Sequence, residues 1–298
     1  MTDDPHVVAV VLNWNNYEDS SRCLESLIDQ DYSNLDIILV DNASTDGSGE
    51  QLNGDFFDIT VIYTKENLGF AGGMNYGIRA AMEESPDYVW ILNNDSILPK
   101  KTLEGLVPIL EYDSDIGILS PRIQTENEEL WFLQGAINWR KCDVDHQVPD
   151  NNSAESQLIS NEYIPMCAAL IRSEVFEQIG LLPEDYFMYY EDVDFCIKTR
   201  RKGYRLATST TTTITHIGSA SSGSDLSALP TYYNFRNRIH LARTYSDQSG
   251  SGFWIYYVMS ILYGTLRRFY NKEFEAVVPL LRGVADGIQE TKGRGPYP

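Results

Sequence analysis

The chain has 298 residues, 43% of them hydrophobic and 22% charged, which fits one large globular domain or two fused halves and excludes a disordered or collagen-like chain. The charge is unusual, because 43 acidic residues face 23 basic ones, for a formal net charge of −20. Such a surface repels phosphate backbones, so we expect no nucleic-acid partner. The same surface is tolerated in concentrated salt and indicates a halophilic archaeal source, although an acidic surface also serves simple solubility.

The cysteines and the N-terminus indicate a cytoplasmic protein. Four cysteines are widely spaced and form neither a zinc motif nor a disulfide framework: Cys23, Cys142, Cys167 and Cys196. The first five residues include two aspartates and no basic residue, whereas a secretory signal begins with basic residues. We therefore expect a reducing cytoplasm.

The first third of the chain alternates predicted strands with predicted helices. Apolar, β-branched runs predict strands over 7–12, 37–40, 60–64 and 88–92. Apolar spacing of three and four residues predicts helices over 21–30 and 72–84, and a Ser-x-x-Gln capping box predicts a short helix from Ser48. This alternation predicts right-handed βαβ units and an α/β fold with a mainly parallel sheet flanked by helices.

Polar residues follow each of the four predicted strands. They are Asn13 and Asn15 in segment 13–16, Asp41 in 41–48, Asn67, Gly69, Gly72 and Asn75 in 67–75, and Asn93, Asn94 and Asp95 in 93–95. Ligands of such sheets bind beyond the carboxyl ends of the strands, so these residues predict a ligand-binding edge. No G-x-G-x-x-G follows the first strand and no G-x-x-x-x-G-K-[ST] occurs, which disfavours dinucleotide oxidoreductases and P-loop proteins.

These four segments, together with Tyr190-Glu191-Asp192-Val193-Asp194, resemble in the same order the motifs of the family 2 glycosyltransferases, and most closely a rhamnosyltransferase-like branch. The resemblance covers about residues 6–245. It implies a GT-A fold, which is Rossmann-like, a nucleotide-diphosphate sugar as donor, Mg²⁺ or Mn²⁺, and an inverting transfer of a hexose to an acceptor hydroxyl. A sugar-nucleotide nucleotidyltransferase and a catalytically inactive sugar-nucleotide-binding protein remain as alternatives.

The resemblance gives roles to the strand-end residues. Asp95 matches the second aspartate of the metal-binding D-x-D motif, while Asn93 replaces the first and implies a ribose contact. With one carboxylate instead of two, we expect the donor phosphates to complete the metal shell. Asp41 implies a contact to the nucleoside. The remaining strand-end residues imply donor binding: Asn13, Asn15, Asn67, Gly69, Gly72, Asn75 and Asn94. Turn, helix-cap and helix–strand packing roles are the alternatives.

Inverting transfer needs a base for the acceptor hydroxyl. Segment 187–195 crowds three carboxylates among aromatic and aliphatic side chains, which raises the pKa of at least one of them. By resemblance to the family's Glu-Asp motif, Asp192 is the base, with Glu191 and Asp194 in support. The alternative is a helix start, where acidic residues are favoured by the helix dipole.

Two further residues are implied by the resemblance. His216 ends a β-branched run and corresponds to a second metal ligand, although a lone histidine is more often structural. Arg236 or its neighbour Arg238 could contact a phosphate, and a plain surface helix is the alternative. The Ser- and Gly-rich segment 218–223 between them is expected to act as a lid over the donor.

The C-terminal part predicts helices outside the catalytic domain. We expect a catalytic domain over 1–245, with a nucleotide-sugar half to about 95 and an acceptor half from 96, followed by a helical extension over 246–298. Segment 253–266 is apolar and aromatic but shorter than the roughly 20 residues that span a bilayer. It predicts a peripheral membrane contact that suits a lipid-linked glycan acceptor for protein glycosylation or polysaccharide synthesis, or a helix packed on the core or in a homodimer.

Overall fold

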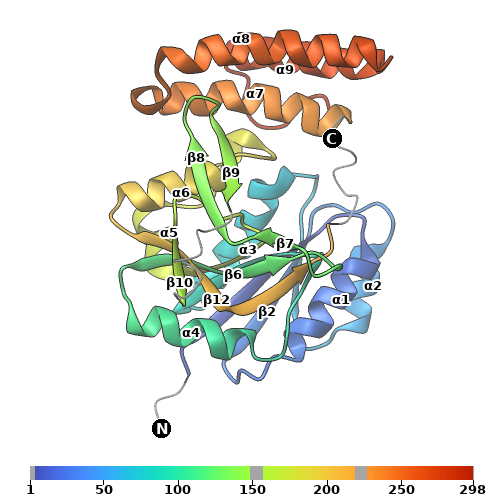
Figure 1. Ribbon diagram of the computed structural model, residues 1–298. Helices are drawn as coiled ribbons and strands as arrows, with labels where there is room; N and C mark the ends of the chain where they lie inside the picture. Colours follow the sequence, from blue (N-terminus) through green and yellow to red (C-terminus); the bar gives the residue numbers. More distant parts are fainter. Residues whose placement is uncertain (1–3, 148–156, 219–226, 298) are drawn as a thin grey trace.

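The computed structural model describes residues 4–147, 157–218 and 227–297. Its centre is a mixed sheet in the order β10-β12-β6-β11-β4-β1-β2-β3, with β5 beside β12 and β7 beside β6 (Figure 1). The strands are β1 (Val7–Asn13), β2 (Leu35–Asp41), β3 (Thr60–Tyr63), β4 (Tyr88–Asn93), β5 (Ser96–Ile97), β6 (Ile116–Gln124), β7 (Leu130–Phe132), β10 (Leu158–Asn161), β11 (Ala168–Arg172) and β12 (Arg205–His216). Strands β8 (Gln134–Asn138) and β9 (Asp143–Gln147) form a separate hairpin.

Helices cover both faces of this sheet. They are α1 (Tyr17–Ile28), α2 (Ser48–Asp55), α3 (Gly69–Glu83), α4 (Thr102–Tyr112), α5 (Ser173–Ile179) and α6 (Glu191–Arg201). The path from β1 to β2 to β3 moves one way along the sheet, and the path from β3 to β4 returns past β1. Right-handed crossovers therefore put α1 and α2 on one face and α3 on the other.

Parallel pairing brings the carboxyl ends of four strands to one edge. Strands β3, β2, β1 and β4 are mutually parallel, and Asn13 pairs in register with Asp41. Most side chains of β1 and β4 are fully buried, as expected for strands covered on both faces. The expected α/β fold with its parallel strands is confirmed, and antiparallel β11 joins this half to the parallel pair β6 and β12.

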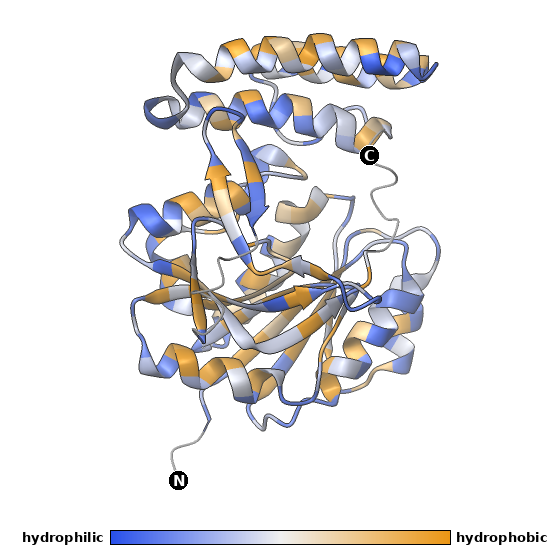
Figure 2. Ribbon diagram, viewed as in Figure 1, coloured by the Kyte–Doolittle hydropathy of each residue, from blue (hydrophilic) through white to orange (hydrophobic). Residues whose placement is uncertain are grey.

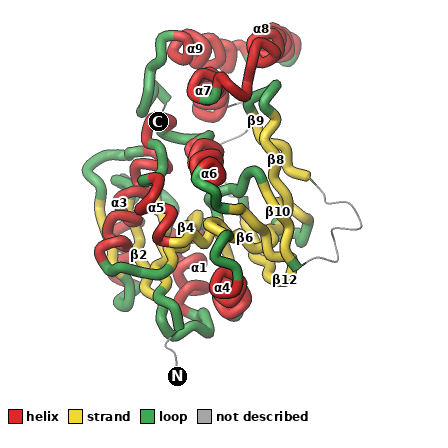
Figure 3. The backbone as a smooth tube through the Cα atoms, turned by 90° about the vertical axis from the view of Figure 1, so that its left-hand side faces the viewer, coloured by secondary structure: helices red, strands yellow, loops and turns green. Residues whose placement is uncertain are grey.

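Three C-terminal helices form a layer above the carboxyl ends of the parallel strands. They are α7 (Ala228–Thr244), α8 (Ser246–Tyr270) and α9 (Val277–Ile288), and α7 packs against both of the others. Figure 3 shows α7 facing α6, with α8 and α9 farther from the sheet. The expected boundary at residue 245 would separate α7 from α8, whereas the structure groups α7 with the helical layer. None of the helices in the described ranges is long and apolar enough to cross a bilayer.

Several predicted boundaries are corrected by the structure. Helix α1 begins at Tyr17, four residues before the predicted start, because the Asn16 side chain accepts from the Asp19 N–H and caps it. The capping box at Ser48 is wrong: Gly47 is the N-cap, and Ser48 is already helical. Helix α3 begins at Gly69, so the glycine-rich segment that was expected to precede the helix forms its first turns.

Candidate active site

Asn13 ties the ends of β1 and β2 together. Its Nδ2 lies 2.8 Å from Asp41 Oδ1, 3.0 Å from Ser48 Oγ and 3.1 Å from Ser44 Oγ, and its Oδ1 accepts from the Ser20 hydroxyl. The residue is fully buried. These contacts occupy the whole amide, so Asn13 orders the edge and does not present its side chain to a ligand.

Asp41 lies at the centre of this edge and is 3% exposed. Its carboxylate accepts from Asn13 Nδ2 and from the Ser44 N–H. A Cβ on Gly49, in the first turn of α2, would lie 2.5 Å from the Asp41 carboxyl carbon, so only glycine allows this close approach. Asn15 joins the same two loops, because its Oδ1 accepts from the Thr45 N–H at 2.7 Å.

The glycine-rich start of α3 packs against the loop that precedes α6. Gly69 has φ +73°, and a Cβ there would lie 2.1 Å from the carbonyl oxygen of Phe187. Asn67 Oδ1 accepts from the Gly69 N–H and from Asn42 Nδ2, which fixes this turn. Gly72 has its own close contact, with Leu68. Both glycines therefore allow close packing, Gly69 against the loop before α6 and Gly72 against the residue that precedes α3, and neither contact is with a strand.

Asn75 is not at the ligand-binding edge. Its Nδ2 donates to the Leu182 carbonyl and to Glu184 Oε1, and its Oδ1 accepts from the Leu182 N–H. The side chain is 1% exposed and fully hydrogen-bonded. The expected donor contact is corrected to a clamp between α3 and the segment before α6.

Asp95 and His216 come together at the end of β4. Antiparallel pairing of β5 with β12 sets His216 opposite Ser96, and His216 Nε2 lies 3.1 Å from Asp95 Oδ1. Both side chains are buried, at 12% and 7% exposure. The two atoms face each other at a distance at which both can bind one cation. A carboxylate oxygen and an imidazole nitrogen are ordinary ligands of divalent metals.

The two asparagines before Asp95 differ in their contacts. Asn94 Nδ2 donates to Ser20 Oγ at 2.8 Å, and Ser20 in turn donates to Asn13. A chain of hydrogen bonds therefore connects the end of β4 through Asn13 to Asp41. Asn93 is half-buried beside Asp95, and its backbone N–H donates to the Cys167 carbonyl.

The loop before α6 has a strained backbone. Phe187, Tyr189 and Tyr190 have φ values of 65°, 66° and 76°, a region that costs a residue with a side chain about 1–3 kcal/mol. Asn237 of α7 holds the loop, since its Nδ2 lies within 3.1 Å of the carbonyl oxygens of Tyr186, Met188 and Tyr189. Such strain is typical of functional sites.

This loop delivers Glu191 and Asp192 as the first two residues of α6. Glu191 is 5% exposed, and burial together with the negative charge of Asp192 raises its pKa well above the ordinary value. Asp192 is half-buried, and burial raises its pKa although a hydrogen bond from the Tyr163 hydroxyl, 2.6 Å from Oδ2, opposes the rise. A carboxylate with a raised pKa is a stronger base, as proton abstraction from an alcohol requires.

Asp194 lies apart from this pair. Its carboxylate accepts from the Tyr245 hydroxyl at 2.7 Å and from Lys198 Nζ at 3.0 Å, and it is 3% exposed. These contacts connect α6 to the junction between α7 and α8. The structure therefore gives Asp194 a contact that holds the helical layer.

Arg236 is also buried, at 1% exposure. Its guanidinium donates to Asn237 Oδ1 and to the carbonyls of Gly293 and Tyr186. Each of the three nitrogens has an acceptor within the protein, so the guanidinium holds the loop before α6 and the C-terminal segment, and a phosphate contact stays a prediction. Arg238 is likewise engaged, with Asp143 and the Tyr190 hydroxyl.

Cys167 links the Asp95 side of the site to the Asp192 side. The Asn93 N–H and the Ser96 hydroxyl both donate to its carbonyl. Burial and the negative charges of Asp95 and Asp192 together raise the pKa of its thiol. Cys167, directly before β11, therefore feels the negative charge of both carboxylates.

An aromatic row completes this connection. The ring of Trp131 lies 4.9 Å from that of His216 and 5.2 Å from that of His146, and His146 stacks on Tyr163, which bonds Asp192. The row comes from β7, β9 and the segment before β11. It runs from one predicted metal ligand to the predicted base.

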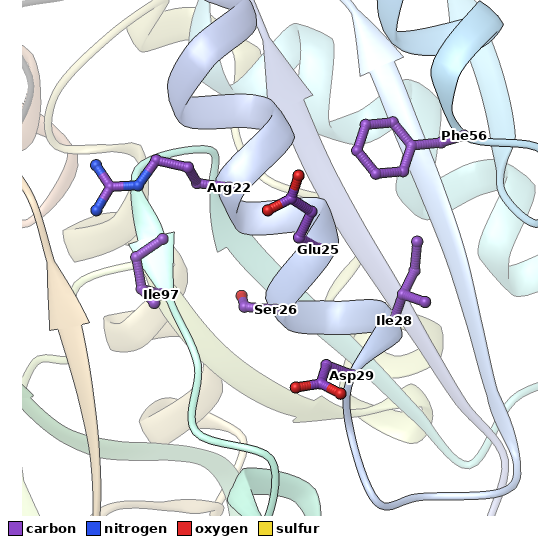
Figure 4. Close-up of a pocket in the computed structure, with 7 residues that line it drawn as sticks. All are labelled: Arg22, Glu25, Ser26, Ile28, Asp29, Phe56 and Ile97. Carbon is purple, nitrogen blue, oxygen red and sulfur yellow. The ribbon is translucent and has the colours of Figure 1, made fainter.

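A hollow of about 640 Å³ lies elsewhere, along α1 (Figure 4). It is lined by Arg22, Glu25, Ser26, Ile28, Asp29, Phe56 and Ile97. None of these residues belongs to the predicted site. The predicted lid over 218–223 falls, except for Gly218, outside the described residues.

Sequence reasoning missed Tyr163 and Asn237. Tyr163 is 29 residues from Asp192, and no motif joins them. Asn237 falls within the segment 232–238 that resembled the family, but its threefold contact with loop carbonyls has no local sequence signal.

Removal of the Tyr163 hydroxyl should shift the pH dependence of the reaction. The Tyr163 hydrogen bond favours the ionised form of Asp192, so Tyr163→Phe raises the Asp192 pKa further. A base works only when deprotonated, so the acidic limb of the kcat/KM profile moves to higher pH. The profile of kcat/KM against pH for both proteins measures this. Tyr204→Phe, which removes a hydroxyl that bonds Gln178, is the matched control. If the acidic limb does not move in Tyr163→Phe, the assignment of Asp192 as the base is wrong.

The comparisons with known proteins agree with this geometry. Residues 8–180 match the model of glycosyl transferase family 2. The low-salt glycan biosynthesis hexosyltransferase Agl10 of Haloferax volcanii is 27% identical over 99% of this chain and 94% of its own length. The glycosyltransferase GlyG of Streptococcus pneumoniae is 33% identical over 58% of both chains.

Two solved structures share the fold. The mannosyltransferase PcManGT of Pyrobaculum calidifontis, in complex with GDP-Man and Mn²⁺, superposes with a TM-score of 0.57 and 16% identity, over 96% of this chain and 88% of its own. GalNAc-T7, with UDP, GalNAc and Mn²⁺, gives a TM-score of 0.70 and 14% identity over 85% of this chain, which spans half the length of that protein. The family model covers more than half of the chain and includes Asp41 and Asp95, so the chain belongs to glycosyl transferase family 2 and is a glycosyltransferase.

Proposed function

We propose that this glycosyltransferase transfers a hexose from a nucleotide-diphosphate sugar to an acceptor hydroxyl with inversion at the anomeric carbon. The observation that carries the proposal is the aromatic row between the two kinds of group: it starts at His216, which lies 3.1 Å from Asp95, and ends at Tyr163, which bonds Asp192. The pair suits a divalent cation, and the single carboxylate suits a base.

Asp95 and His216 are the residues that would hold the cation. A divalent ion there stabilises the negative charge that grows on the departing diphosphate. Two protein ligands leave most of the coordination shell to the donor phosphates, so metal and donor bind together. The imidazole of His216 favours Mn²⁺ over Mg²⁺, because Mg²⁺ prefers an all-oxygen shell.

Asp192 receives the proton of the acceptor hydroxyl. As the acceptor oxygen forms a bond to the anomeric carbon, the bond from that carbon to the diphosphate oxygen breaks, and the nucleoside diphosphate leaves. Tyr163 fixes the Asp192 carboxylate at 2.6 Å through Oδ2. Glu191 is buried beside it, and burial together with the charge of Asp192 raises the pKa of Glu191, which favours its neutral form.

The donor lies along the edge formed by β2, β1 and β4. Asp41 faces the nucleoside, and Asn93 the ribose, as the motifs imply. Asn13, Asn15, Asn67 and Asn94 keep this edge in place through their hydrogen bonds.

The acceptor is a growing glycan, and we infer that it is lipid-linked and used for surface glycans. Agl10, which is similar over nearly its whole length, is a hexosyltransferase of glycan biosynthesis. Such an acceptor places the enzyme at the cytoplasmic face of a membrane. The alternative is that the helical layer of α7, α8 and α9 forms a homodimer.

A ligand screen tests the donor class directly. With Mn²⁺ present, one nucleotide-diphosphate hexose should raise the melting temperature more than its free nucleoside diphosphate, since a ligand of the native state stabilises by mass action. The same donor should be hydrolysed slowly without acceptor. If dinucleotides or nucleoside triphosphates plus sugar phosphates stabilise the protein and no nucleotide sugar does, the proposed reaction is wrong.

A further inference from the structure

Helix α8 exposes an apolar face that nothing in the described chain covers. Nine apolar side chains on it are 41% to 89% exposed: Trp254, Ile255, Val258, Met259, Leu262, Tyr263, Leu266, Phe269 and Tyr270. At about 100° per residue they occupy about half the circumference of the helix. The opposite side packs on the protein through Phe253 and Tyr257. We call the nine residues the outer face.

The outer face continues onto α9. Val278 and Leu281 are 63% and 50% exposed, and α9 packs beside α8. Figure 2 shows hydrophobic bands along both helices, at the end of the molecule farthest from the N-terminus. From residue 248 to 266 the chain has no charged residue. Apolar patches of this extent on a protein surface mark an interaction site.

The charges around the outer face differ in sign from those of the rest of the protein. Between Asp247 and Asp286 the chain has four basic and two acidic residues, in a protein of net charge −20. Three of the four are exposed, namely Arg267, Lys272 and Arg282. An anionic surface therefore attracts this end of the molecule and repels the remainder, which selects one orientation. A second copy would instead bring two patches of the same sign together.

We propose that the outer face lies on a lipid bilayer with anionic headgroups, with α8 and α9 in the plane of the interface. The aromatic side chains Trp254, Tyr263 and Tyr270 suit the headgroup region, where rings of this kind concentrate. The aliphatic side chains between them enter the acyl boundary, as in interfacial helices. This membrane is the one that would carry the lipid-linked acceptor of the proposed function. The evidence for it is the exposed side chains of α8 and α9, which do not depend on the donor chemistry.

Helix α7 connects this surface to the site. On one side it packs against α8 and α9, and on the other its Asn237 holds the loop that precedes Asp192. Docking through the outer face therefore positions the carboxyl edge of the sheet toward the membrane, where the head of a lipid-linked acceptor lies. A water-soluble acceptor needs no such orientation.

Vesicle flotation without donor or metal tests the proposal. The wild-type protein should float with vesicles of phosphatidylcholine and phosphatidylglycerol, and less with phosphatidylcholine alone. Val258→Asp with Leu262→Asp places two carboxylates on the outer face and should lower the bound fraction about tenfold or more. Phe57→Asp with Tyr112→Asp, at positions 87% and 94% exposed elsewhere, adds the same charge and should float like the wild type.

The other outcomes overturn the proposal. The proposal is wrong if the wild-type protein floats with neither kind of vesicle. It is also wrong if the control variant loses as much vesicle binding as the outer-face variant. Sedimentation velocity tests for a second copy as the partner. That partner is identified if the wild type is a dimer that binds no vesicles and the outer-face variant is a monomer. Should the double variant not fold, Leu266→Asp, at 68% exposure, replaces it. Donor binding, measured separately on the same proteins, shows whether the proposed reaction fails independently.

Discussion

Replacement of Asp192 by Asn should lower kcat by about 10²–10⁴-fold, the usual contribution of a positioned general base. The amide keeps the size of the side chain and can still accept from Tyr163, but it cannot take a proton from the acceptor. Because Asp192 contacts Tyr163 and is not part of the Asp95–His216 pair, the affinity for the donor should stay near the wild-type value. Single-turnover kinetics and donor calorimetry separate the two quantities.

The neighbouring carboxylates provide matched controls for this experiment. Asp194→Asn removes the negative charge that pairs with Lys198, while the amide oxygen can still accept from Tyr245, so it should lower the melting temperature more than the turnover. Glu191→Gln keeps the buried shape of the side chain and removes the titratable carboxyl group beside Asp192. Near-normal turnover in Asp192→Asn, with a large loss in either of the others, would move the base to that residue.

Replacement of Asp95 by Asn should weaken Mn²⁺-dependent donor binding by roughly 10²-fold, because a metal ligand supplies several kcal/mol and 1.4 kcal/mol is tenfold. Calorimetry with Mn²⁺ and with EDTA measures the metal-dependent part. In the wild type the two affinities should differ strongly. In the variant they should nearly coincide, since His216 alone then remains as a protein ligand.

Asp46 offers a control on the same edge of the sheet. It is exposed, and its carboxylate accepts from the Ser48 N–H. Asp46→Asn therefore makes the same chemical change close to the donor edge without touching the Asp95–His216 pair, and the metal dependence should be retained. If Asp46→Asn and Asp95→Asn lost the same amount of metal-dependent donor affinity, the cause would be a general electrostatic effect of the edge, and Asp95 would not be a metal ligand.

The fold and the donor edge could be predicted because both depend on local signals. Buried β-branched runs predicted β1, β2 and β4, and the polar residues after them had to meet where parallel strands end. Asp41 and Asp95 follow from that rule alone. That His216 lies beside Asp95 could be predicted only from the resemblance to the family, because the pairing of β5 with β12 joins segments more than 100 residues apart.

Other residues could not be predicted, because their roles depend on contacts between distant segments. Asn75 and Arg236 are polar residues near motifs, but their partners are the backbone carbonyls of Leu182, Tyr186 and Gly293. Buried amides and guanidinium groups need such partners, and no sequence pattern specifies which carbonyl will be within reach. In the same way, no sequence pattern specifies that Tyr163 bonds Asp192.

A crystal structure with Mn²⁺ and a nucleoside diphosphate tests the central claim most directly. We expect an anomalous Mn²⁺ peak coordinated by Asp95 Oδ1 and His216 Nε2 and by the diphosphate, with the Asp192 carboxylate on the acceptor side of the metal. A metal bound at the surface group of His6, Asp36 and Glu84, or a diphosphate in the hollow along α1, would contradict it.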